Sequence, residues 1–166
     1  MRRLAERIES LVERDRGRLR RVAEMQAVRR AAAHGLHTAC ADFVAAVNAV
    51  LDEPVVLLDP PEFTAASYSD DATNLIQINV HGRILQVAYA ATAELISTED
   101  FRIPYIMEGS VRAFNQEMLD KDLIEEQQLF YTVEPNRNMW RYFESLTYRS
   151  GPFDRAFLVS VMERIL

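Results

Sequence analysis

Two arginines lie in segments of the chain that otherwise have the composition of apolar strands. Arg112 and Arg141 are accompanied in these segments by three aromatic residues, Tyr131, Trp140 and Tyr142. A guanidinium group that is buried or half-buried needs an anionic partner, because an unpaired charge is costly away from water. One interpretation is therefore a site for a small anionic ligand, with a carboxylate or phosphate held among the aromatic rings.

The alternative is that these arginines form ion pairs inside the protein. Glutamates such as Glu117 and Glu144 lie in the same predicted strands and could neutralise them. We favour this structural role over a ligand site. The five residues named above remain the candidates for ligand binding that the sequence offers.

The other residues with reactive side chains form no convincing catalytic or metal site. His34 and His37 are one helical turn apart, close enough to share a metal ion, but no second pair of ligands accompanies them. Cys40 falls on an apolar helical face, which favours a core residue over a nucleophile. We find no phosphate loop, dinucleotide fingerprint, nucleophile elbow or zinc motif. The sequence therefore predicts no catalytic residue, no metal and no cofactor, and it favours a protein that is not an enzyme.

The composition is that of an ordinary globular domain with a small appendage. The chain has 166 residues, of which 49% are hydrophobic and 27% are charged. A single cysteine cannot form a disulfide within one chain, so we expect a reducing compartment, the cytoplasm. The first ten residues carry charges where a signal peptide needs an apolar run, and no stretch has the length of a membrane span.

The net charge of −6 is unevenly distributed along the chain. Residues 1–36 contain ten arginines and five acidic residues, a formal charge of +5, and the remaining 130 contain nine basic and twenty acidic residues, −11. We assign residues 1–30 to a helical arm that could join subunits, and residues 31–166 to a single α+β domain. The arm could instead contact a nucleic-acid backbone, but it has no interleaved aromatic residues, and the acidic body would repel phosphate.

Apolar residues at helical spacing predict helix over most of the first 51 residues. The stripe begins with Leu4, Ile8 and Leu11 and resumes after the polar segment 15–18. That segment, which contains Gly17, is either the turn of a helical hairpin or a weak point in one long helix. An unbroken helix would be about 75 Å long, more than the width of the domain. The arm therefore either folds back near Gly17 or projects and pairs with another subunit.

The strongest strand signal is a hairpin at residues 75–89. Two runs of strand-forming residues flank the dipeptide His81-Gly82, a combination typical of a two-residue turn. The turn predicts the opposite pairs Val80 with Arg83, Ile78 with Leu85, and Ile76 with Val87. One face of the hairpin is then apolar, as a half-buried antiparallel pair requires.

Further strands are predicted along the rest of the chain, at residues 55–58, 101–107, 110–118, 127–133 and 139–148. Residues 90–100 read as a connector, and the last helix is predicted to start at residues 150–152. Strands joined by short turns are antiparallel. The predicted class is α+β, with N-terminal helices, an antiparallel meander sheet of about six strands, and a C-terminal helix packed on one face.

The last predicted hairpin, residues 127–148, has no polar face. We place on one side Leu129, Tyr131, Val133, Arg141 and Phe143, and on the other side Phe130, Trp140, Tyr142 and Leu146. A sheet that is apolar on both sides needs two covering layers. The helices can supply one. The other layer must come from a loop or the arm of the same chain, from a second subunit or from a ligand.

These observations favour a non-enzymatic protein-interaction or binding module that acts as a cytoplasmic homodimer, with a protein as a further partner. The second hypothesis is a small-molecule binding domain or enzyme with the arginine and aromatic pocket. Nucleic-acid binding through the basic arm ranks third. No membrane association is expected.

Overall fold

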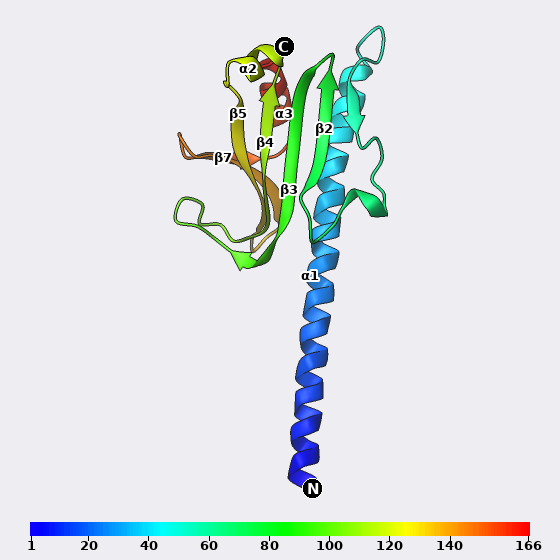
Figure 1. The fold of residues 1–166 in the computed structure, drawn as a ribbon, viewed down its shortest axis with the longest axis vertical. Helices are drawn as coiled ribbons and strands as arrows, with labels where there is room; N and C mark the ends of the chain where they lie inside the picture. Colours follow the sequence, from blue (N-terminus) through cyan, green and yellow to red (C-terminus); the bar gives the residue numbers. More distant parts are fainter.

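The computed structural model describes all 166 residues, and it consists of one long helix attached to an antiparallel sheet (Figure 1). The helices are α1 (Arg2–Asn48), α2 (Gln116–Asp120) and α3 (Arg155–Glu163), with a short 3-10 turn η1 (Ala65–Ser67). The strands are β1 (Leu57–Asp59), β2 (Asn74–Val80), β3 (Arg83–Ile96), β4 (Tyr105–Phe114), β5 (Glu125–Val133), β6 (Asn138–Glu144) and β7 (Arg149–Pro152). The strands pair in chain order, each antiparallel to the next. The predicted α+β meander is confirmed, with seven strands in place of about six.

The N-terminal helix α1 is unbroken from Arg2 to Asn48, so the predicted N-terminal helices are one. The segment contains no proline, and a glycine inside a helix costs only about 1 kcal/mol, which explains why Gly17 does not interrupt it. Only the second half of α1 packs against the sheet, through the buried residues Ala32, Ala33, Leu36, His37, Cys40, Phe43 and Val44. The first half extends beyond the sheet, with the N-terminus at its tip (Figure 1). The arm therefore projects and does not fold back.

The end of α1 is fixed by one side chain. The amide of Asn48 donates from Nδ2 to the carbonyl of Val56 at 2.9 Å, and its Oδ1 accepts from the Val56 N–H at 3.0 Å. These two bonds hold the chain as it turns back toward β1. The helix consequently ends three residues before the predicted end at Leu51.

The central hairpin of β2 and β3 has the predicted register. Val80 pairs with Arg83, Ile78 with Leu85 and Ile76 with Val87. His81 and Gly82 both have positive φ, 49° and 84°, as a two-residue turn with the twist of a hairpin requires. The Asn79 side chain closes the turn by accepting from the Gly82 N–H at 2.8 Å.

The main core lies between one face of the sheet and the two helices α1 and α3. It combines apolar residues of the middle strands, such as Leu85, Val111 and Leu129, with Leu36 of α1 and Leu158 of α3, all of them almost fully buried. Trp140 of β6 also donates from Nε1 to the carbonyl of Ala32 at 2.8 Å. This bond ties α1 to the sheet just above the point where the arm leaves it.

The second face of the last hairpin is covered by the loop between β3 and β4. Phe101 of this loop stacks on Phe130 with ring centroids 4.4 Å apart and contacts Phe143 at 5.5 Å. Tyr105, at the start of β4, lies 4.4 Å from Phe130. Of the alternatives for this second layer, a loop of the same chain is the one that the structure contains.

The side-chain placement predicted for the last hairpin was wrong by one residue in β6. Tyr131 pairs with Trp140 and Phe130 pairs with Arg141. Trp140 and Tyr142 therefore share a face with Tyr131, whereas Arg141 shares the opposite face with Phe130. Both faces are apolar, so the hydrophobic pattern cannot distinguish one register from the register one residue away.

Several boundaries also differ from the prediction. Strand β3 continues through the predicted connector to Ile96, and β4 is one strand in place of the two predicted at residues 101–107 and 110–118. Residues 116–118, predicted as strand, belong to helix α2, which Asn115 caps by accepting from the Met118 N–H at 2.9 Å. Pro152 ends the edge strand β7, where its missing N–H costs no ladder bond, and does not start the last helix. Helix α3 begins after Asp154 because the carboxylate of Asp154 caps the N–H of Phe157 at 2.9 Å.

Candidate functional site

The structure separates the five predicted ligand-binding residues into two groups. The three aromatic residues lie on the face of the sheet that α1 and α3 cover: the Tyr131 and Trp140 rings are 5.3 Å apart, and Tyr142 stacks on Phe157 of α3 at 4.4 Å. Arg112 and Arg141 pair with Glu126 and Phe130 in β5, on the opposite face. No single pocket contains both groups.

Arg141 is paired within the protein. Its Nε and Nη2 donate to the two carboxylate oxygens of Glu134 at 3.0 and 2.9 Å, and Thr132 donates to the same carboxylate at 2.7 Å. Both charged side chains are about three-quarters buried, with 23% and 24% exposure. The hydrogen bonds from Arg141 and Thr132 hold the pKa of Glu134 below its usual value of 4.5. Glu134, immediately after β5, neutralises this arginine in place of the expected Glu144.

Arg112 has a looser and more exposed partner. Its Nε lies 3.5 Å from a carboxylate oxygen of Glu126, without the alignment of a hydrogen bond. Glu117, the other carboxylate considered for this role, instead binds Lys121 one helical turn away at 2.6 Å. An exposed pair of this kind contributes little to stability.

The histidines and the cysteine have structural contacts. The His34 ring stacks on Phe63 at 4.8 Å, and His37 Nε2 lies 2.8 Å from the carbonyl of Pro60. Cys40 is fully buried, and burial raises the pKa of its thiol to about 12. No three His, Cys, Asp or Glu side chains lie close enough together to hold a metal ion.

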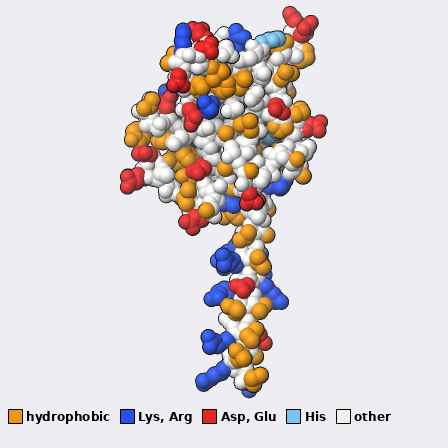
Figure 2. All heavy atoms as spheres, in the orientation of Figure 1, with side chains coloured by type: hydrophobic (Ala, Val, Ile, Leu, Met, Phe, Trp, Pro, Cys, Tyr) orange, Lys and Arg blue, Asp and Glu red, His pale blue; other side chains and the backbone are white.

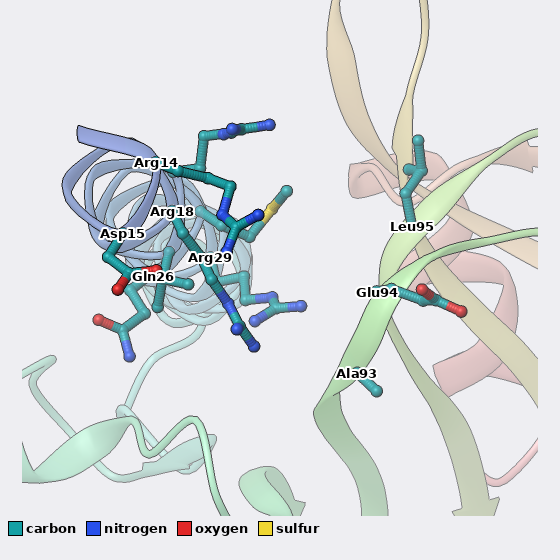
Figure 3. Close-up of a pocket in the computed structure, with 11 residues that line it drawn as sticks. Arg14, Asp15, Arg18, Gln26, Arg29, Ala93, Glu94 and Leu95 are labelled. Carbon is teal, nitrogen blue, oxygen red and sulfur yellow. The ribbon is translucent and has the colours of Figure 1, made fainter. Parts of the chain in front are cut away.

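A groove of about 830 Å³ opens between α1 and the end of β3 (Figure 3). The helix contributes one wall with Arg14, Asp15, Arg18, Arg21, Val22, Met25, Gln26 and Arg29, and the strand contributes the other with Ala93, Glu94 and Leu95. Arg29 closes the top of the groove by donating to the carbonyl of Thr92. Figure 3 shows Arg14 and Arg18 reaching from the helix toward the gap, with Glu94 and Leu95 across it.

The helix wall of this groove belongs to a stripe that runs the length of the arm. The stripe consists of Leu4, Ile8, Leu11, Asp15, Arg18, Val22 and Met25, and we call it the seam. Its members are spaced alternately four and three residues apart, as in a helix that pairs with another helix. Leu4, Ile8, Leu11 and Val22 are each about half exposed. Figure 2 shows apolar side chains along the arm, interleaved with arginines.

The seam continues directly into the face of α1 that the sheet covers. The next positions in the same spacing are Arg29, Ala32 and Leu36, and the last two are buried against the sheet. The same face of the helix is therefore covered in its second half and uncovered in its first. Helices in proteins owe most of their stability to packing of an apolar face. The first half of α1 has no such packing within the single chain.

Comparison with protein-family models, with curated proteins and with solved structures finds no match for this chain. None of the three helices combines the length and the apolar character that crossing a membrane requires. The fold and the groove therefore define the protein as an α+β meander with a projecting helix.

Sequence reasoning missed two parts of this site. The spacing of the seam runs through Asp15 and Arg18, and following it across the polar segment would have joined the two apolar stripes into one. The opposite wall, Ala93 to Leu95, falls in the segment predicted as a connector, so no sequence signal placed it beside the arm.

Proposed function

We propose that this chain is a non-enzymatic protein-interaction module that acts as a homodimer through its projecting arm. The observation that carries the proposal is the half-exposed apolar seam on a helix that extends alone into solvent. At about 1.5 Å per residue, the 25 residues of the arm before the sheet span about 40 Å. A second helix of the same sequence supplies an apolar face of matching length.

Two further features support this function over a ligand site. Arg141 is neutralised by Glu134 inside the protein, and the three aromatic candidates are packed under α1 and α3. Cys40 is free and buried, which suits the reducing conditions of the cytoplasm. The proposed dimer leaves the far edges of the sheet available to a further protein partner.

The test is the molar mass of the full chain in solution, measured by light scattering over a dilution series. We expect twice the mass of one chain. The variant Leu11→Glu places a charge in the middle of the seam, and it should raise the dissociation constant by about 100-fold, since burying an unpaired charge at an interface costs several kcal/mol. Circular dichroism should show that the body of the variant is still folded.

A matched control separates this function from nucleic-acid binding by the arm. Arg16 and Arg20 point away from the seam, and both are exposed. The variant Arg16→Glu/Arg20→Glu should leave the dimer intact, whereas nucleic-acid binding would be weakened by the loss of positive charge. A monomeric wild-type chain that binds duplex DNA, and loses that binding in this variant, would favour the basic arm as a nucleic-acid contact.

A further inference from the structure

The two charged residues of the seam indicate how the two arms meet. We propose that the arms pair antiparallel, with Asp15 of each helix facing the partner's Arg18. This inference rests on the proposed homodimer and specifies its geometry. Asp15 and Arg18 are the only charged members of the seam, and both line the groove.

The charges discriminate between the two orientations of the pair. In a parallel pair each residue meets its own copy, so two carboxylates and two guanidinium groups would face each other in the middle of an apolar interface. In an antiparallel pair the central layers combine Asp15 with the partner's Arg18, and the symmetry repeats the contact. A buried charge needs an opposite charge beside it, so the sequence of the seam favours the antiparallel orientation.

The same register places apolar residues together on both sides of the centre. Leu11 faces the partner's Val22, and Ile8 faces the partner's Met25. Next to the seam, Val12 meets the partner's Leu19, and both are exposed in the single chain, by 41% and 70%. A shift of one heptad would set Asp15 against the partner's Leu11 or Met25 and leave both charges unpaired.

The register also assigns an occupant to the groove. The partner's Leu4 and Ile8 reach Arg29 and Met25, the level at which Ala93 to Leu95 form the second wall. The first two turns of the partner therefore fill the space between α1 and the end of β3. They cover Leu95, which is 49% exposed in the single chain, and bring positive charge to Glu94.

One like-charge contact opposes the arrangement. Arg14 lies beside the partner's Arg21 on the other side of the seam, and both are exposed. This repulsion occurs at the surface, where salt screens it, whereas the central pairs are shielded from solvent. The dimer should accordingly tolerate high salt.

Charge reversal tests the central contact. Asp15→Arg alone and Arg18→Asp alone each create two like-charge contacts in the antiparallel pair, and each should weaken the full-length dimer about 100-fold. The double variant Asp15→Arg/Arg18→Asp restores opposite charges and should recover affinity to within about tenfold of the wild type. Glu13→Arg, the same charge change on the opposite side of the helix, is the control and should have little effect. Failure of the double variant to recover the dimer would overturn the inference.

Disulfide trapping tests the orientation independently. Full-length chains carrying Leu11→Cys or Val22→Cys are oxidised mildly, alone and mixed, and Cys40 adds no background because it is buried. The antiparallel register predicts a disulfide only in the mixture, since Leu11 lies about 16 Å along the axis from its own copy.

The outcomes distinguish the geometry from the function itself. Cross-linking of each variant with itself indicates a parallel dimer, so the proposed function stands and the geometry is wrong. If the wild-type chain is a monomer and neither cysteine variant cross-links, alone or mixed, both the geometry and the function are overturned. Cross-linking confined to the mixture supports both.

Discussion

At the residue scale, the protein uses its charged side chains in two different ways. On the sheet, Arg141 is neutralised by Glu134 within one hairpin, with two hydrogen bonds and Thr132 as a third partner. On the arm, Asp15 and Arg18 have no ion-pair partner within the chain. The first arrangement stabilises the body, and the second leaves charges available to a partner.

The Glu134 pair should make stability depend on pH. Because its pKa is lowered in the folded state, Glu134 stabilises the fold above its unfolded pKa, near 4.5, and this contribution is lost as the pH falls through the folded value. The difference in unfolding free energy between wild type and Glu134→Gln should therefore shrink as the pH is lowered from about 6 to about 3. Urea unfolding of the wild type and of Glu134→Gln at several pH values measures this difference in unfolding free energy.

The exposed pair of Arg112 and Glu126 provides the control for that experiment. Glu126→Gln changes the same chemical group opposite an arginine, but its side chain is 55% exposed. Exposed pairs contribute little, so its effect at neutral pH should be small. Arg141→Ala should destabilise the protein by about 1–3 kcal/mol, because it leaves a largely buried carboxylate with only Thr132 donating to it. An equal cost for both glutamate variants would contradict this account.

At the element scale, the success of sequence reasoning depended on how many constraints acted on each segment. The register of β2 and β3 was predictable because a two-residue turn and one apolar face agree. The register of β6 was not predictable. The four-residue loop from Glu134 to Arg137 does not determine which residues of β5 and β6 lie opposite each other, and both faces of the hairpin are apolar. The sequence predicted that Arg141 forms an ion pair with a glutamate inside the protein. Which glutamate it pairs with depends on the register of β6, and so could not be predicted. The groove depends on β3 extending to Ile96, which the composition of residues 90–100 does not reveal.

One glycine controls how closely two strands approach. A Cβ at Gly109 would lie 1.9 Å from the carbonyl oxygen of Ala88 and 2.8 Å from the Cα of Tyr89. Gly109→Ala must therefore push β3 away from β4 in the middle of the sheet, and we expect a loss of about 3 kcal/mol or more in unfolding free energy.

Gly35 on α1 is the matched control for the same substitution. A Cβ there meets nothing within 4 Å, and alanine is the better helix former. Gly35→Ala should raise stability by up to about 1 kcal/mol. Thermal unfolding of the two variants side by side gives the comparison. A neutral Gly109→Ala variant would show that the sheet adapts more easily than its backbone contacts suggest.

At the scale of the whole molecule, the projecting arm determines the shape of the proposed dimer. The chain termini lie at opposite ends of the molecule, with the N-terminus at the tip of the arm (Figure 1). Antiparallel arms set the two bodies at opposite ends of a helical pair. Parallel arms would place the two bodies side by side, where their acidic surfaces repel each other.

Small-angle X-ray scattering should report this shape directly. With Asp15 opposite the partner's Arg18, the parts of α1 that carry the two bodies are separated by about 70 Å along the helix axis. We expect a pair-distance distribution with two maxima, the second near that separation. A single maximum from a dimer would indicate bodies in contact and a parallel arrangement.

The bond between Trp140 and Ala32 spans 108 residues of sequence, and this has a consequence for protein synthesis. The helix leaves the ribosome before the strands that cover it, and β6 is among the last of these strands to be made. During that interval the whole apolar face of α1 is uncovered, from Leu4 to Phe43. In the proposed dimer, two nascent chains on the same messenger are free to pair their helices before either sheet exists, so we expect assembly to precede completion of the fold.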